Sequence, residues 1–204
     1  HKKQLYLTES FYNKNEPGAN FAGYVWAEDF FRVTGEKKYI EILTKYANLY
    51  KISNPKYPPE PSDISFRSED IFFTSALLGR AYNFTKNLTF SKILFQYLNN
   101  ITTQKPDGLF KHNISTPWNW GRSNGFAAIG YSEALTYLHE HKEKIEYQDV
   151  LDRHTAQIEI LVKLQNEDGT WMQVLDDKSS YHEFSVTCMI GYALARGIRM
   201  GWLD

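Results

Sequence analysis

Cysteine is almost absent from this sequence, because Cys188 is the only one among 204 residues. A single cysteine cannot form an intrachain disulfide, so the redox compartment stays open. Cys188 lies in an apolar run, which predicts an inert buried thiol rather than a nucleophile.

Long apolar runs and an excess of one charge are also missing. No stretch approaches the roughly 18 apolar residues that span a bilayer, so we expect no membrane partner. The formal net charge is -1, from 23 basic and 24 acidic residues, and no global field would recruit nucleic acid.

The compartment is not decided by the sequence. Residues 1–3 are His-Lys-Lys with no signal-peptide core after them, so a targeting segment was either removed or never present. Glycosylation sequons at four positions weakly favour a secretory route, although an Asn-rich bacterial protein would look the same. They are Asn83, Asn87, Asn100 and Asn113.

Aromatic residues, by contrast, are plentiful, at 16% of the chain. Aromatic faces stack on sugar rings, so this surplus fits a carbohydrate cleft. A large aromatic core is the commoner explanation, and composition alone does not separate the two.

The apolar pattern predicts a mostly helical protein, because helical spacing recurs while strict alternation is scarce. We expect helices near 19–33, 37–51, 69–83, 88–102, 124–139, 147–165 and 183–200. Shifting 25–50 by 51 positions aligns similar residues, among them Tyr39 with Phe90, Leu43 with Leu94 and Tyr46 with Tyr97. Such a period is typical of helical hairpins in α-solenoids and closed α/α toroids.

Three connections are longer than simple turns: 52–68, 103–124 and 166–182. Each follows the second helix of a pair, so in a toroid all three would emerge at the same end. Loops gathered on a rigid scaffold commonly carry binding sites.

The second of these connections ends in a segment suited to binding an acidic sugar. Arg122 can bind a carboxylate through two parallel hydrogen bonds, and Trp120 offers a stacking face. A helix that starts after Asn124 would add free backbone N–H groups for an anion. Alternatively, Asn124 only caps the helix and Arg122 pairs with a neighbouring acid.

Three separated motifs resemble glycoside hydrolase family 105, the unsaturated rhamnogalacturonyl hydrolases, which are related to the family 88 unsaturated glucuronyl hydrolases. They are Trp120-Gly-Arg-Ser-Asn-Gly-Phe126, Gly169-Thr-Trp-Met-Gln-Val174, and Glu183 followed by Tyr192-Ala-Leu-Ala-Arg-Gly-Ile-Arg199. The resemblance runs from about residue 19 to residue 204. It implies an all-α (α/α)6 barrel, here a single toroid domain over 1–204, without metal or cofactor.

The resemblance also implies an unusual glycoside hydrolysis. The substrates are oligosaccharides left by polysaccharide lyases, which end in a uronic acid with a C4=C5 double bond. An acid protonates the vinyl ether, water adds at C5, and the hemiketal collapses to release the next sugar. The carboxylate spacing rule of ordinary glycosidases therefore does not apply directly.

Asp70 is the catalytic residue that the resemblance implies, because the run Glu69-Asp70-Ile71-Phe72-Phe73 resembles the segment that carries the family's aspartate. A general acid active near neutral pH needs a raised pKa, which the apolar residues after Asp70 could supply. The alternative is a first-turn aspartate whose pKa the helix dipole lowers.

Further roles follow from the resemblance residue by residue. Trp120 and Arg122 match positions that bind the uronate, and His112 matches a histidine near the scissile sugar. Trp171 could instead fill the end of the barrel. The expected substrate-binding residues are His112, Trp120, Arg122, Asn124, Phe126, Trp171 and Gln173.

The sequence departs from the family in three respects. Asn20 falls near the place of a second aspartate, and an amide cannot relay a proton; Phe126 stands where Trp is common. Seven helices are fewer than six hairpins need, so the N-terminal hairpin or hairpins and the final helix are expected to be missing. Apolar faces would then be exposed unless further chain segments or a second copy cover them.

Two other interpretations remain at this stage. A catalytically inactive sugar-binding or scaffold protein would keep the toroid and the Trp-Arg cleft. An unrelated toroid that binds Mg²⁺ or Zn²⁺ would need clustered ligands, and Asp176-Asp177 is the only adjacent aspartate pair.

Overall fold

The computed structural model describes residues 17–116 and 118–204. The interpretation of residues 1–3 lies outside this part of the chain. The elements are α2 (Pro17–Ala22), α3 (Trp26–Thr34), α4 (Lys38–Ala47), α5 (Glu69–Thr85), α6 (Leu88–Asn99), α7 (Gly121–Tyr137), η1 (His139–His141), α8 (Ile145–Lys163), β1 (Trp171–Met172), β2 (His182–Glu183) and α9 (Phe184–Met200). No helix in the described ranges is both long and apolar enough to cross a bilayer.

Consecutive helices pair as hairpins, as the 51-residue period predicts. Gly35 ends α3 in the left-handed conformation, at φ 69°, and donates its N–H to Phe31 O at 2.8 Å. The next hairpin turns at Lys86, and Asn87 caps α6 by accepting a hydrogen bond from the Thr89 N–H at 3.0 Å. The third hairpin, α7 and α8, turns through η1.

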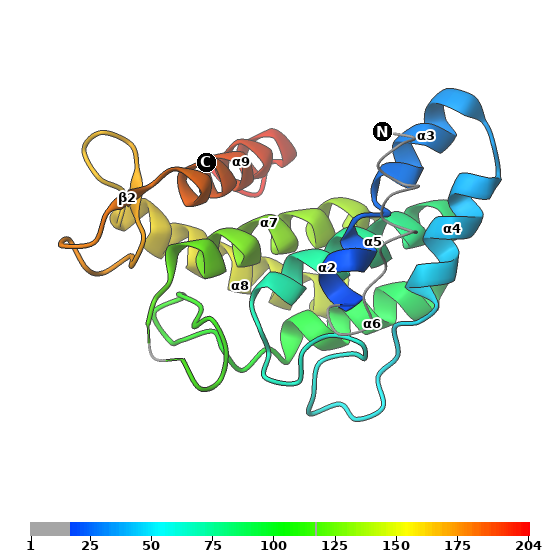
Figure 1. Ribbon diagram of the computed structural model, residues 1–204, viewed down its shortest axis with the longest axis horizontal. Helices are drawn as coiled ribbons and strands as arrows, with labels where there is room; N and C mark the ends of the chain where they lie inside the picture. Colours follow the sequence, from blue (N-terminus) through cyan, green and yellow to red (C-terminus); the bar gives the residue numbers. More distant parts are fainter. Residues whose placement is uncertain (1–16, 117) are drawn as a thin grey trace.

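The hairpins stack into two rows of helices (Figure 1). α5 packs against α7, and α7 packs against α9, while α3 stands beside them as the first helix of its own hairpin. We call α3, α5, α7 and α9 the inner row; the second helices, α4, α6 and α8, form the outer row. This mostly helical arrangement of stacked hairpins agrees with the predicted class, an incomplete (α/α)6 toroid.

The aromatic surplus lies largely in the core. The main cluster contains buried residues from each α-helix from α3 through α8. In it the Tyr24 ring stacks on the Tyr46 ring, with centroids 3.9 Å apart. A smaller cluster under α9 includes Trp171 and Ile190. The commoner explanation of the composition therefore accounts for most of these residues.

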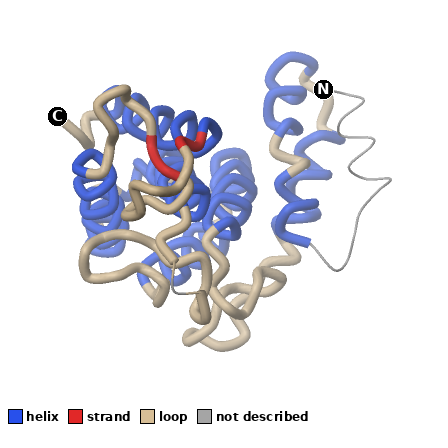
Figure 2. Tube along the Cα trace, turned by 60° about the vertical axis from the view of Figure 1, so that its left-hand side comes forward, coloured by secondary structure: helices blue, strands red, loops and turns tan. Residues whose placement is uncertain are grey.

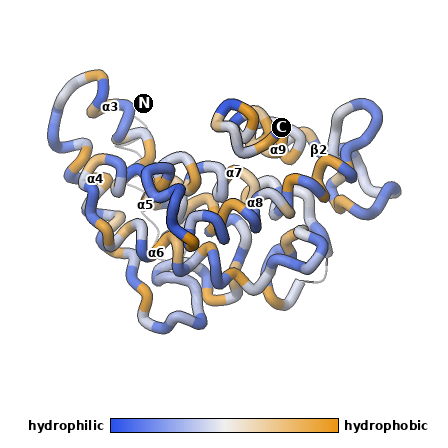
Figure 3. Tube along the Cα trace, turned by 180° about the vertical axis from the view of Figure 1, so that it is seen from behind, coloured by the Kyte–Doolittle hydropathy of each residue, from blue (hydrophilic) through white to orange (hydrophobic). Residues whose placement is uncertain are grey.

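The long loops adjoin one another, and they make up most of the non-helical part of the described residues (Figure 2). Between the first two loops, the Ser68 N–H donates to His112 O at 2.9 Å, and the Ile114 N–H donates to Ser65 O at 3.0 Å. The second and third loops join where Trp120 pairs with Val174. The segment between β1 and β2 is mostly hydrophilic (Figure 3).

The structure corrects two predicted helix boundaries. The helix expected over 19–33 is divided into α2 and α3, because Gly23, Tyr24 and Val25 bond three residues back instead of four. The helix expected from 124 begins three residues earlier, at Gly121.

The prediction of a buried Cys188 was wrong, because its side chain is exposed. Val186, Ile190 and Ala193 form the buried stripe of α9, and Cys188 lies on another face of that helix. α9 also exposes Phe184 (79%) and Ile198 (58%), so its apolar sequence is only partly buried.

Candidate functional site

A pocket of about 280 Å³ opens where the first turns of α5 and α7 meet the long loops and α2. Two arginines, a carboxylate and three aromatic rings face it, so it combines charge with stacking surfaces. Its lining residues are Ala19, Arg67, Glu69, Phe73, Trp120, Arg122 and Phe126. Three of the seven predicted substrate-binding residues, Trp120, Arg122 and Phe126, are among them.

Trp120 and Arg122 are placed by a tight junction at the start of α7. Gly121 donates its N–H to Gln173 O at 2.7 Å, and a Cβ at Gly121 would lie 2.6 Å from Met172 O. Only glycine fits there, because any side chain would push the third loop away. The Arg122 guanidinium carbon lies 4.6 Å from the centroid of the Trp120 ring.

Arg122 is exposed, and within the described residues it forms no ion pair. The alternative that Arg122 pairs with a neighbouring acid therefore has no support among these residues. Its planar guanidinium can instead bind a ligand carboxylate.

Glu69 is the carboxylate of this pocket, and sequence reasoning missed it. Nε2 of His112 lies 3.1 Å from both Glu69 oxygens, and the His112 ring meets Trp120 edge-on at 5.1 Å. His112 is thus in contact with two of the pocket residues. No local signal in the sequence separates Glu69 from Asp70; in the structure, Phe73, four residues after Glu69, lines the same pocket, as helical spacing requires.

Asp70, the predicted catalytic residue, lies behind the pocket wall with only 1% of its surface exposed. Its carboxylate accepts a hydrogen bond from the Asp63 N–H at 2.9 Å and lies 3.3 Å from Arg67 Nη2. Burial raises the pKa of Asp70, against the lowering effect of these two partners. The raised pKa suits a proton donor, but Asp70 itself is not among the residues that line the pocket, whereas its partner Arg67 is.

Helix α2 covers Asp70. A Cβ at Gly18 would lie 2.6 Å from Asp70 Oδ1, and the neighbouring Ala19 lines the pocket. Asn20, the predicted second catalytic position, is on this same helix and is half-buried.

Asn124 does not line the pocket and does not begin the helix. Its amide is buried and bonds to Phe110 in both directions, accepting from the N–H at 2.8 Å and donating to the carbonyl at 2.9 Å. The predicted anion site after Asn124 was wrong, because α7 begins at Gly121. Asn124 fastens the second loop to α7.

Trp171 and Gln173 also lie outside the pocket lining. Trp171 is buried in the smaller core cluster, and its indole N–H donates to Leu161 O at 2.8 Å. Trp171 is therefore a core residue, in agreement with the alternative that it fills the end of the barrel. Gln173 contributes its backbone: its carbonyl accepts from Gly121 and its N–H donates to Tyr181 O at 2.8 Å.

Comparison with known proteins adds the family. The profile of Glycosyl Hydrolase Family 88 matches residues 78–204, more than half of the chain. The unsaturated rhamnogalacturonyl hydrolase YesR of Bacillus subtilis (strain 168) is 39% identical over 75 residues, which cover 37% of this chain and 21% of YesR. The pocket residues Arg67 and Glu69 precede the part that the profile matches.

Solved structures share the fold at low identity. A glycoside hydrolase of family 105 from C. acetobutylicum ATCC 824 has a TM-score of 0.77 and 20% identity, over 95% of this chain and 61% of that one. A polysaccharide lyase, BACCELL_00875, also reaches 0.77, with 19% identity over 92% and 55%. The chain spans little more than half of these structures, and the fold alone does not select hydrolysis.

Proposed function

Because the chain belongs to Glycosyl Hydrolase Family 88, we propose that its pocket binds the unsaturated uronyl end of oligosaccharides released by polysaccharide lyases and hydrolyses them. The observation that carries this proposal is one pocket in which Arg122, Trp120 and Glu69 converge. A carboxylate partner, a ring-stacking face and a proton-transferring group are what such a sugar requires. No cofactor enters the proposal.

In the proposed complex, Arg122 binds the uronate carboxylate, and the sugar ring stacks against Trp120 with Phe73 and Phe126 beside it. These side chains already line one cavity, so little rearrangement is needed. The remaining polar side of the pocket is Glu69 with His112.

A carboxyl group of this site protonates C4 of the double bond, and water then adds its oxygen at C5. The water returns a proton to the carboxylate, and the hemiketal collapses with release of the next sugar. Asp70 remains the sequence prediction for this group, and its raised pKa favours it. Glu69 is favoured by access, because it lines the pocket while Asp70 is buried. We propose Glu69 as the group that contacts the sugar.

Loss of the ultraviolet absorbance of the double bond tests the function directly. We expect native chain incubated with unsaturated rhamnogalacturonyl or glucuronyl disaccharides to remove this absorbance. Glu69→Gln should abolish the decay, while Asp70→Asn should leave a measurable rate. Complete loss in Asp70→Asn with activity in Glu69→Gln would assign the chemistry to Asp70 instead.

A catalytically inactive sugar-binding protein is the second candidate, and Asn20 on the helix that covers Asp70 favours it. In that case the disaccharides bind, seen as quenching of tryptophan fluorescence, without any loss of absorbance.

A separate proposal concerns α9, which exposes Phe184 and Ile198. We propose that further chain segments or a second copy cover this helix. Light scattering at increasing protein concentration tests for the second copy.

A further inference from the structure

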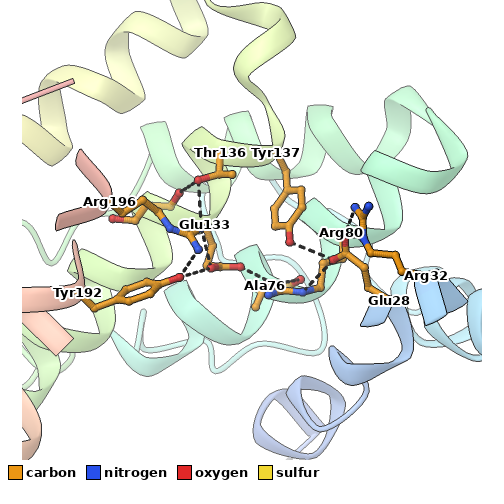
Figure 4. A network of polar contacts seen from close by, with 10 residues as sticks. Glu28, Arg32, Ala76, Arg80, Glu133, Thr136, Tyr137, Tyr192 and Arg196 are labelled. Carbon is orange, nitrogen blue, oxygen red and sulfur yellow. Dashed lines mark hydrogen bonds and ion pairs between the residues drawn. The ribbon is translucent and has the colours of Figure 1, made fainter. Parts of the chain in front are cut away.

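Four charged side chains form a row across the inner helices at one depth (Figure 4). They alternate in sign: Glu28 on α3, Arg80 on α5, Glu133 on α7 and Arg196 on α9. Arg80 Nε lies 3.2 Å from Glu28 Oε2, and Arg196 Nη1 lies 3.0 Å from Glu133 Oε1. Arg80 and Glu133 form the central ion pair. We call these four residues the charge belt.

The two acids of the charge belt are buried, the two arginines are partly exposed, and the belt is bonded on several sides. The side chains of Glu28 and Glu133 are only 6% and 4% exposed. The Tyr137 hydroxyl donates to Glu28 Oε2 at 3.0 Å, and Arg80 Nη1 donates to Ala76 O at 3.0 Å. Buried ion pairs recover their desolvation cost only in a narrow geometry, so they fix relative positions better than they add stability.

The central ion pair and the pocket occupy the same two helices at matched spacing. Arg80 follows Glu69 on α5 by 11 residues (69 to 80), and Glu133 follows Arg122 on α7 by 11 residues (122 to 133). Eleven residues are about three helical turns, roughly 16 Å, so each pair lies on one face of its helix. At the pocket, α5 carries the acid and α7 carries the arginine; at the charge belt, α5 carries the arginine and α7 carries the acid.

We propose that Arg80 and Glu133 are positioning residues for the pocket: their ion pair fixes the register of α5 against α7, and with it the placement of Glu69 relative to Arg122. The inference rests on the proposed function of that pocket. A slide of one helix by about 1 Å would separate the uronate-binding arginine from the acid, which can cost on the order of 100-fold in rate.

The test compares Arg80→Met on α5 and Glu133→Gln on α7 with a control on α5. Tyr82→Phe removes contacts of a buried hydroxyl to Glu140 and His141 on η1, away from the charge belt. We expect Arg80→Met to lower kcat/KM for the unsaturated rhamnogalacturonyl disaccharide about 100-fold. Arg80→Lys should recover part of this loss, because it retains the charge without the planar fork. Tyr82→Phe should lower the melting temperature without changing kcat/KM.

If Arg80→Met loses no more activity than Tyr82→Phe at equal loss of melting temperature, the inference is overturned. Glu133→Gln keeps the shape of the side chain and serves where Arg80→Met does not fold. If the native chain turns over no disaccharide, the proposed function fails. Crystal structures of the native chain and of Glu133→Gln then test the register of α5 against α7 without an activity measurement. An unchanged position of Glu69 relative to Arg122 would overturn the inference, and a displacement of about 1 Å or more would support it.

Discussion

Nε2 of His112, on the second loop, lies 3.1 Å from the carboxylate of Glu69, the first residue of α5. The contact spans 43 positions of sequence and joins a loop to the rigid inner row. It places the acid on the pocket side of α5, whereas the next residue, Asp70, faces the interior. Two adjacent acids on one helix therefore have different surroundings and can take different roles.

Arg122→Lys should weaken binding of the uronyl sugar although the charge is retained. Lysine lacks the planar fork that binds a carboxylate through two hydrogen bonds, and it stacks less well on Trp120. We expect KM for the unsaturated disaccharide to rise roughly tenfold, about 1.4 kcal/mol, with the melting temperature unchanged. Arg199→Lys, at an exposed position of α9, is the matched control. Equal KM values for the two variants would contradict a role of Arg122 in binding.

Asn124→Ala should act on stability rather than on the pocket. The substitution leaves the N–H and carbonyl of Phe110, a fully buried residue, without their partner. We expect a loss of about 2–4 kcal/mol in the free energy of unfolding, measured by urea titration. Asn100→Ala removes one exposed contact, to Gln96 O, and should cost less than about 0.5 kcal/mol. A raised KM with unchanged stability would instead restore Asn124 as a binding residue.

The sequence predicts those features of the fold and of the site that depend on residues close together in the chain. The seven helical segments follow from apolar spacing within each segment, and the hairpins follow from the 51-residue similarity. Trp120, Arg122 and Phe126, which line one pocket, also belong to one short motif. Local patterns were sufficient for these features.

Features fixed by distant contacts were not predictable in the same way. The start of α7 depends on the Gly121 bond to Gln173 in another loop, and the role of Asn124 depends on Phe110. Glu69 and Asp70 are adjacent in the sequence, and the residues around them do not show which of the two lines a pocket. Only the packing of α2 over Asp70 shows that Glu69 is the one lining the pocket.

Gly121→Ala should displace the loop that supports the pocket. A methyl group there would lie 2.6 Å from Met172 O and 3.2 Å from Gln173 O, so the third loop must move. We expect a loss of about 1–3 kcal/mol in unfolding free energy, with lower affinity for the disaccharide.

The matched control is Gly191→Ala in α9, where a Cβ meets nothing within 4 Å. That substitution should stabilise the helix by roughly 0.5–1 kcal/mol. Destabilisation of similar size in both variants would show that the close contact at Gly121 is not the cause.

His154 should make the protein less stable in acid. Its ring is fully buried between the Tyr131 ring and Trp202, and burial lowers its pKa from 6.5 to about 4. Between these two values the unfolded chain binds a proton that the folded chain excludes. The contribution of His154 to stability is therefore complete above about pH 6.5 and is lost as the pH falls toward 4, by on the order of 3 kcal/mol.

His154→Leu should remove this part of the pH dependence, because leucine binds no proton and keeps the buried site apolar. Ser132, which lies 3.4 Å from His154 Nε2, retains its bond to Ala128 O and is not left without a partner. Urea titrations of both proteins from pH 8 to pH 4 measure the difference. The native chain should lose stability relative to His154→Leu across this range, and His139→Gln, at an exposed position, should lose it as the native chain does. Parallel curves for the native chain and His154→Leu would show that burial does not lower the pKa of His154 in the folded protein.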